Sequence, residues 1–233
     1  TQTLIDERIK NNAPPLESFS PQKLRALRAK MAETPEKLRV YISYVEDFTI
    51  KGSLGPITVR KYFNENSDTL INQKQPLIIY FHGGGFVMGD LESHDLVCRH
   101  LCKQTNATII AVDYKLAPEH KFPAAITDTI DSITEIISRA DEFNIDQNKV
   151  ILCGDSAGGA LAAVGTIMSR DKLIPKVHGQ ILVYPWVDMT MCRRSMDIDL
   201  EGMILNKKTI EYFADHYLNS YEEQVDWRAS PLL

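Results

Sequence analysis

The chain has 233 residues, of which 44% are hydrophobic and 24% charged, and its formal net charge is −5. This size and composition indicate one soluble globular domain with a real hydrophobic core. The negative charge gives no electrostatic reason to expect a nucleic acid or an anionic membrane as partner. No apolar run approaches the length of a transmembrane helix.

The first segment predicts a helix. Ser20 and Pro21 form an N-terminal helix signal. Apolar residues then recur at helical spacing, at Leu24, Leu27 and Met31. The segment that starts at Thr1 is polar and has no apolar signal core. We therefore predict a cytoplasmic protein.

The middle of the chain predicts an α/β fold. Val40–Ile50 and Ile57–Tyr62 alternate apolar and polar residues, which predicts an antiparallel pair at a sheet edge. Short apolar runs then alternate with helical patterns, as in a parallel sheet covered on both faces. The expected strands are Leu77–Phe81, Thr108–Asp113, Val150–Cys153 and Gln180–Tyr184, and the expected helices lie near Ser93–Gln104, Pro123–Arg139 and from the residues after Ser156 to about Ser169.

The sharpest signal is the stretch Gly154-Asp155-Ser156-Ala157-Gly158, which follows a buried strand and opens a helix rich in small residues. A serine at the tip of such a turn is strained, and its neighbours two residues away must be small. The turn holds the hydroxyl above the sheet at the positive end of a helix. This is the nucleophile elbow, although a bare match also occurs by chance.

A second signal follows the strand that ends at Phe81. His82 is followed by the three consecutive glycines Gly83, Gly84 and Gly85, whose backbone N–H groups are free to point into a cavity. In acyl transfer such groups stabilise the oxyanion of the tetrahedral intermediate. A phosphate loop would need a Gly-Lys-Ser/Thr ending, which is not present.

Together these motifs resemble the hormone-sensitive-lipase family of α/β-hydrolases, in its bacterial esterase branch. His82–Gly85 matches that family's HGGG loop, and Gly154–Gly159 matches its GDSAGG elbow. Asp113–His120, followed by Phe122–Ala125, matches a third family stretch that reads DYRLAPEH and FPAA. The resemblance covers nearly everything from about residue 40 to residue 233.

The resemblance implies a mostly parallel central sheet with helices on both faces and an N-terminal helical cap. We expect residues 1–35 to form the cap segment, although a peripheral packing helix is the alternative, and residues 36–233 to form the catalytic domain. Residues 188–221 are expected to form a second cap segment. Ser156 is the implied nucleophile, with the N–H groups of Gly83, Gly84 and Ala157 as the oxyanion hole. The substrate wall is expected at Gly85, Phe86, Asp155 and Tyr184.

A serine nucleophile also needs a histidine as base and a carboxylate that orients the histidine, and the sequence shows neither at the expected place. The family places its acid and its histidine beyond a DPRASPLL-like stretch, and this chain ends there, at Asp226–Leu233. We therefore expect the catalytic domain to be incomplete at its C-terminus and this chain alone to be inactive. Of the histidines after Ser156, His178 opens a strand, far from the expected site. Asp188 with His216 fits the chain order of a triad only formally.

The leading hypothesis is a serine carboxylesterase or lipase-type hydrolase acting on short- to medium-chain acyl esters. The alternatives are a receptor-like ligand-binding protein on the same fold and an inactive fragment. The resemblance implies no metal and no organic cofactor, and a small-molecule ester as partner, with a homo-oligomer possible. Four cysteines without framework spacing indicate free thiols, with a metal site at Cys98 and Cys102 as a minor alternative.

Overall fold

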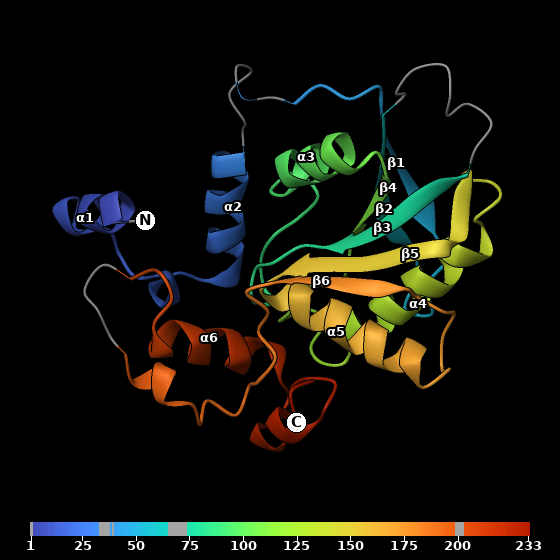
Figure 1. Ribbon diagram of the computed structural model, residues 1–233. Helices are drawn as coiled ribbons and strands as arrows, with labels where there is room; N and C mark the ends of the chain where they lie inside the picture. Colours follow the sequence, from blue (N-terminus) through green and yellow to red (C-terminus); the bar gives the residue numbers. More distant parts are fainter. Residues whose placement is uncertain (1, 33–37, 39, 65–73, 199–202) are drawn as a thin grey trace.

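The computed structural model describes residues 2–32, 38, 40–64, 74–198 and 203–233. In this part of the chain a six-stranded sheet has helices on both faces (Figure 1). The strands are β1 (Tyr44–Ile50), β2 (Ile57–Phe63), β3 (Gln75–Phe81), β4 (Thr108–Asp113), β5 (Ile145–Asp155) and β6 (Gly179–Val183). The α-helices are α1 (Gln2–Lys10), α2 (Pro21–Ala32), α3 (Asp95–Thr105), α4 (Ala124–Ser138), α5 (Ala157–Arg170) and α6 (Lys207–Tyr217).

The strands lie in the order β1-β2-β4-β3-β5-β6. β2 pairs antiparallel with β1 and with β4, whereas the pairs β4–β3, β3–β5 and β5–β6 are parallel. This confirms the predicted α/β class and the antiparallel pair at one edge. At the other edge β6 is hydrogen-bonded only to β5 among the described strands.

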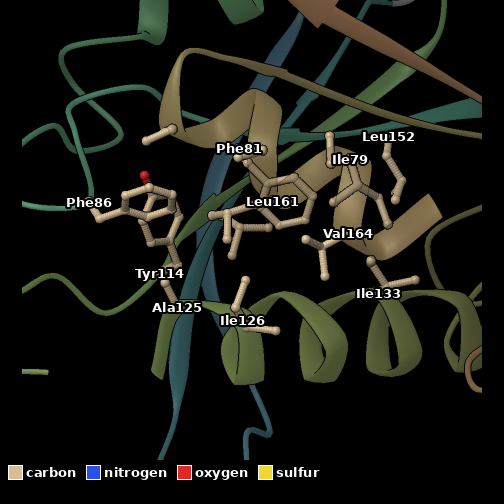
Figure 2. Packing of buried hydrophobic residues seen from close by; sticks show 14 of the residues in the cluster. Ile79, Phe81, Phe86, Tyr114, Ala125, Ile126, Ile133, Leu152, Leu161 and Val164 are labelled. Atoms are coloured by element: carbon tan, nitrogen blue, oxygen red, sulfur yellow. The ribbon is translucent and has the colours of Figure 1, made fainter. Parts of the chain in front are cut away.

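The two faces of the sheet bury different residues, because side chains alternate along a strand. On β3, Leu77, Ile79 and Phe81 join the larger hydrophobic cluster, which includes residues of α4 and α5. Figure 2 shows part of this cluster, with α4 below and α5 above. Ile78 and Tyr80 face the other side, in a smaller cluster with residues of α3. The predicted continuous apolar strands are therefore buried on both faces.

Most predicted elements agree with the structure to within a few residues. β5 is the exception: Val150–Cys153 was expected, but the strand begins at Ile145. Its first part is polar, from residue 146 to residue 149, and the pairing with β3 shifts between Gln75 and Leu77. Apolar patterning does not reveal a strand of this kind.

Segments from the two ends of the chain meet beside the sheet. Ser20 Oγ accepts the N–H of Lys23 at 3.3 Å as the helix signal predicts, and Asn206 caps α6 by accepting the N–H of Thr209 at 2.9 Å. Tyr212 OH donates to the carbonyl of Phe19 at 3.0 Å, which joins α6 to the segment before α2. The assignment of residues 1–35 and 188–221 as cap segments stays a prediction.

Candidate active site

Ser156 lies in a sharp turn between β5 and α5. Its backbone has φ 52° and ψ −119°, a region that residues other than glycine rarely adopt. The Ser156 N–H donates to the carbonyl of Val183 at 2.9 Å, and its carbonyl accepts the N–H of Trp186 at 3.0 Å. The end of β6 and the segment that follows it therefore hold the strained turn from both sides.

The small residues around the turn are required by close backbone contacts. A Cβ atom on Gly158 would lie 2.0 Å from the carbonyl oxygen of Phe81, and one on Gly154 would lie 2.3 Å from the oxygen of Gly158. Both distances are far inside van der Waals contact. The glycines thus allow α5 to begin directly against the end of β3.

The glycine loop after β3 lies beside this turn. Gly84 has φ 135°, and a Cβ there would lie 1.9 Å from the carbonyl oxygen of Met88. No acceptor among the described residues takes a hydrogen bond from the N–H groups of Gly84, Gly85 or Ala157. These three donors are free to bind an oxyanion.

The role expected for Gly83 needs correction. Its N–H donates to Asp155 Oδ1 at 2.9 Å, so this donor is already occupied. The same carboxylate oxygen accepts Tyr80 OH at 2.7 Å and lies 3.4 Å from His94 Nε2. Asp155 therefore ties the glycine loop to the residue that precedes Ser156.

These contacts also set the charge of Asp155. Burial opposes its ionisation, but hydrogen bonds from His94, Tyr80 and the Gly83 N–H outweigh burial and hold the pKa of Asp155 below its ordinary value. The group is a carboxylate at neutral pH. With three donors around it, it serves as a support of the loop.

His82 supports the same loop from inside the protein. It is 2% exposed and stacks on Tyr114, with ring centroids 4.4 Å apart. Its Nδ1 lies 2.9 Å from the carbonyl of Gly83 and donates to it, since a carbonyl can only accept. Burial lowers the pKa of His82 to about 4, so the ring is neutral at pH 7.

A cavity of about 360 Å³ opens over Ser156. Most of its wall is apolar and comes from segments far apart in the sequence: Leu16, Met88, Pro185, Trp186, Ile204, Leu205, Ile210 and Phe213. Of the predicted substrate residues, Gly85, Asp155 and Tyr184 line this cavity, and Tyr184 is 75% exposed. Elements from both ends of the described chain thus form one concave site.

The prediction that Phe86 lines the substrate wall is wrong. It is 2% exposed, does not line the cavity, and stacks on Tyr217 with ring centroids 3.9 Å apart. Conversely, sequence analysis missed Arg28 and Trp186 as lining residues. The position of Trp186, two residues beyond Tyr184 at a strand end, was the available signal. Nothing in the sequence around Arg28 indicates that it faces the site.

The proton acceptor for Ser156 is not among the side chains described. None of them forms a hydrogen bond with Ser156 Oγ. His216 Nδ1 lies 2.8 Å from the carbonyl of Tyr212, and Asp188 accepts Arg193 Nε at 2.8 Å. Neither lines the cavity, so the structure does not bring the formal Asp188–His216 pair to Ser156. His178 lines a separate hollow.

Two further features bear on the class of protein. Cys98 and Cys102 are buried free thiols, and within the described ranges no group of three or more His, Cys, Asp or Glu side chains could hold a metal ion. The described helices include none that is long and apolar enough to cross a membrane.

A family model described as alpha/beta hydrolase fold matches residues 78–233. The chain belongs to this family. The strand order and the serine turn of this α/β-hydrolase agree with that assignment, and the predicted family and fold are confirmed.

Several proteins that are similar to this α/β-hydrolase are named as esterases. The carboxylic ester hydrolase LipN of Mycobacterium tuberculosis is 37% identical over 195 residues, which is 81% of this chain and 50% of LipN. The ethyl acetate hydrolase of Pseudomonas putida is 35% identical over 159 residues, 67% of this chain and 49% of that protein. The solved Pyrobaculum calidifontis esterase has a TM-score of 0.88 and 35% identity, covering 97% of this chain and 73% of that one. This chain thus spans about half the length of these two curated relatives.

Proposed function

We propose that this protein is a serine carboxylesterase in which Ser156 attacks short- to medium-chain acyl esters. The observation that carries the proposal is the strained Ser156 in the wall of an apolar cavity that Gly84 and Gly85 also line, with their N–H groups and that of the adjacent Ala157 unoccupied. The esterase names of the similar proteins support the same reaction class.

In the proposed reaction, Ser156 Oγ forms a bond to the ester carbonyl carbon, and the carbonyl oxygen takes up the electron pair of its π bond. The N–H groups of Gly84, Gly85 and Ala157 donate to this oxyanion. The positive end of α5 lies at the same place. Collapse of the intermediate breaks the bond from the carbonyl carbon to the alcohol oxygen, which leaves as the alcohol with the proton that Ser156 lost; water then attacks the acyl-enzyme, returns a proton to Ser156 Oγ and releases the acid.

This chemistry needs a base that takes the proton of Ser156, because a serine hydroxyl is a weak nucleophile at neutral pH. None of the side chains described here contacts Ser156 Oγ, so the proposal assigns no base. Loss of the histidine in other serine hydrolases lowers turnover about a millionfold. We therefore expect the chain 1–233 to hydrolyse esters slowly.

The test is hydrolysis of p-nitrophenyl butyrate by the 233-residue chain and by its variants. Ser156→Ala should abolish the rate above background. Gly84→Val should lower it about a hundred- to a thousandfold, as loss of an oxyanion donor does. Gly55→Val is the matched control, because Gly55 also has a positive φ, of 110°, but has no atom within 4 Å of its Cβ position.

Each outcome separates the esterase from the alternatives. Turnover that survives Ser156→Ala would overturn the assignment of the nucleophile. Near-normal turnover in Gly84→Val would remove the glycine loop from the mechanism. Binding of esters without any turnover would favour the receptor-like function.

A further inference from the structure

Arg28 places a positive charge in the cavity wall. It lies on α2 and lines the same cavity as Ser156. No described side chain or carbonyl accepts a hydrogen bond from its guanidinium. Arg28 is also close enough to Tyr184 for its charge to oppose the rise that burial causes in the tyrosine pKa. Its charge is therefore directed toward the site.

Arg25, one turn earlier on α2, shows how a structural arginine behaves in this protein. Its guanidinium donates to the carbonyls of Val87 at 2.7 Å and Ala117 at 2.6 Å, and binds both carboxylate oxygens of Glu119. Every nitrogen of Arg25 thus has a partner within the described structure. Arg28 lacks such partners, so its role is not explained by packing of α2.

Within the described wall, Arg28 forms no ion pair with a carboxylate. Asp155 is the one carboxylate among the described lining residues, and its Oδ1 is held by Tyr80, Gly83 and His94, with no hydrogen bond or ion pair to Arg28. Arg28 is half-buried, and its guanidinium has no hydrogen-bond partner among the described residues. A carboxylate on a ligand would give it two parallel hydrogen bonds.

We infer that Arg28 selects esters that carry a free carboxylate, an inference that rests on the proposed esterase function. The cavity then binds an apolar chain along its wall and the anionic end at Arg28, while the ester carbonyl lies at Ser156. A carboxylate is favoured over a phosphate because Arg28 is the one arginine or lysine among the described lining residues. A single cation balances one negative charge and not two.

The first test compares p-nitrophenyl hydrogen glutarate with p-nitrophenyl pentanoate, in which a methyl group replaces the carboxylate. The measured quantity is the ratio of kcat/KM for the anionic ester to that for the neutral one. Arg28→Met should lower this ratio about tenfold or more, and Arg28→Lys should retain part of it. Lys30→Met is the matched control, since Lys30 is exposed on the same helix and lies outside the wall; it should leave the ratio unchanged.

The second test needs no turnover and so separates this inference from the proposed function. In a Ser156→Ala background, binding of glutaric acid monoanilide and of pentananilide is measured by calorimetry, with Trp186 fluorescence as a second signal. Arg28→Met and Arg28→Gln, each checked for an unchanged melting temperature, should weaken the acid about tenfold and leave the uncharged anilide unaffected.

The outcomes of the two tests are distinct. Selective loss of the acid, with no ester turnover in any form of the protein, would support Arg28 as an anion site and overturn the esterase. Ester turnover with an unchanged ratio in Arg28→Met would keep the esterase and overturn the role of Arg28. Equal binding of the two anilides by the Ser156→Ala protein would overturn it as well.

Discussion

At position 156 a serine occupies a backbone conformation that glycine adopts without steric cost. Conformations of this kind cost about 1–3 kcal/mol in other residues. Ser156→Gly should therefore raise the free energy of unfolding by about 1 kcal/mol, after the greater chain entropy of glycine is subtracted. Ser156→Ala keeps the strain and is the matched control.

Urea unfolding of the two variants checks this expectation. The glycine variant should have the higher midpoint, with the same dependence on urea concentration. Equal midpoints would mean that the turn carries no strain, and that the hydrogen bonds of Ser156 to Val183 and Trp186 fully accommodate its φ angle.

His82 makes the stability of the fold depend on pH. Its folded-state pKa is about 4, below the ordinary value of 6.5, because the ring is buried. Between these two values the unfolded chain binds a proton that the folded protein does not. The free energy of unfolding should therefore fall as the pH drops from 6.5 to 4, by up to about 3 kcal/mol.

The measurement is urea unfolding at several pH values in this interval. His82→Asn cannot take up this proton, so its stability should change less steeply with pH than that of the parent. His178→Asn, at an exposed position, is the control and should keep the parental slope. Identical slopes for all three proteins would show that His82 does not titrate on unfolding.

At the scale of elements, Arg25 fixes α2 to the rest of the molecule through the carbonyls of Val87 and Ala117. Both hydrogen bonds have a charged donor and are partly buried. Arg25→Met should cost about 1.5–3 kcal/mol of unfolding free energy. Lys23→Met, on an exposed position of the same helix, should cost little; an equal loss in both would mean that the helix is held by its apolar face alone.

The sequence predicted the elements whose patterns are local. Thr108–Asp113 is apolar from end to end and is a strand with those bounds. Ser20 and Asn206 are helix caps whose chemistry acts within three residues. The beginning of β5 was missed, because residues 146–149 are polar and their place in the sheet depends on the partner strand.

The site was predictable only where its chemistry is local as well. The turn at Ser156 follows from its flanking glycines, and the structure confirms their close contacts. The occupied N–H of Gly83 depends on Asp155, 72 residues later in the chain. Phe86 was wrongly predicted in the cavity wall and Arg28 was not predicted there, for the same reason: which of them faces the cavity depends on the packing of α6 and α2.

At the scale of the whole molecule, the reactivity of the four thiols reports how well the folded protein shields its buried cysteines from solvent. Cys98, Cys102 and Cys153 are buried, whereas Cys192 is exposed. Burial raises the pKa of Cys102 to about 11 and that of Cys153 to about 12, so neither forms the reactive thiolate at neutral pH. We expect a thiol reagent to label one cysteine quickly in the folded protein.

In the unfolded and unreduced protein the same reagent should label four. Cys192→Ser should abolish the fast reaction and leave the slow one unchanged. Fewer than four thiols after unfolding would reveal a disulfide and contradict the prediction of free cysteines. More than one fast thiol in the folded protein would show that the face covered by α3 opens readily.

Tyr212 and Phe19, which are joined by a hydrogen bond, lie 193 positions apart in the chain. The ribosome therefore makes them at different times. A ribosome adds about 5–20 residues per second. The segment around Phe19 therefore emerges roughly 10–40 s before its partner on α6 exists. The central strands, which lie between these two points in the sequence, are complete first. Until α6 is made, Phe86 has no Tyr217 ring to stack on, and Gly85 lies open on the side that Phe213 later covers.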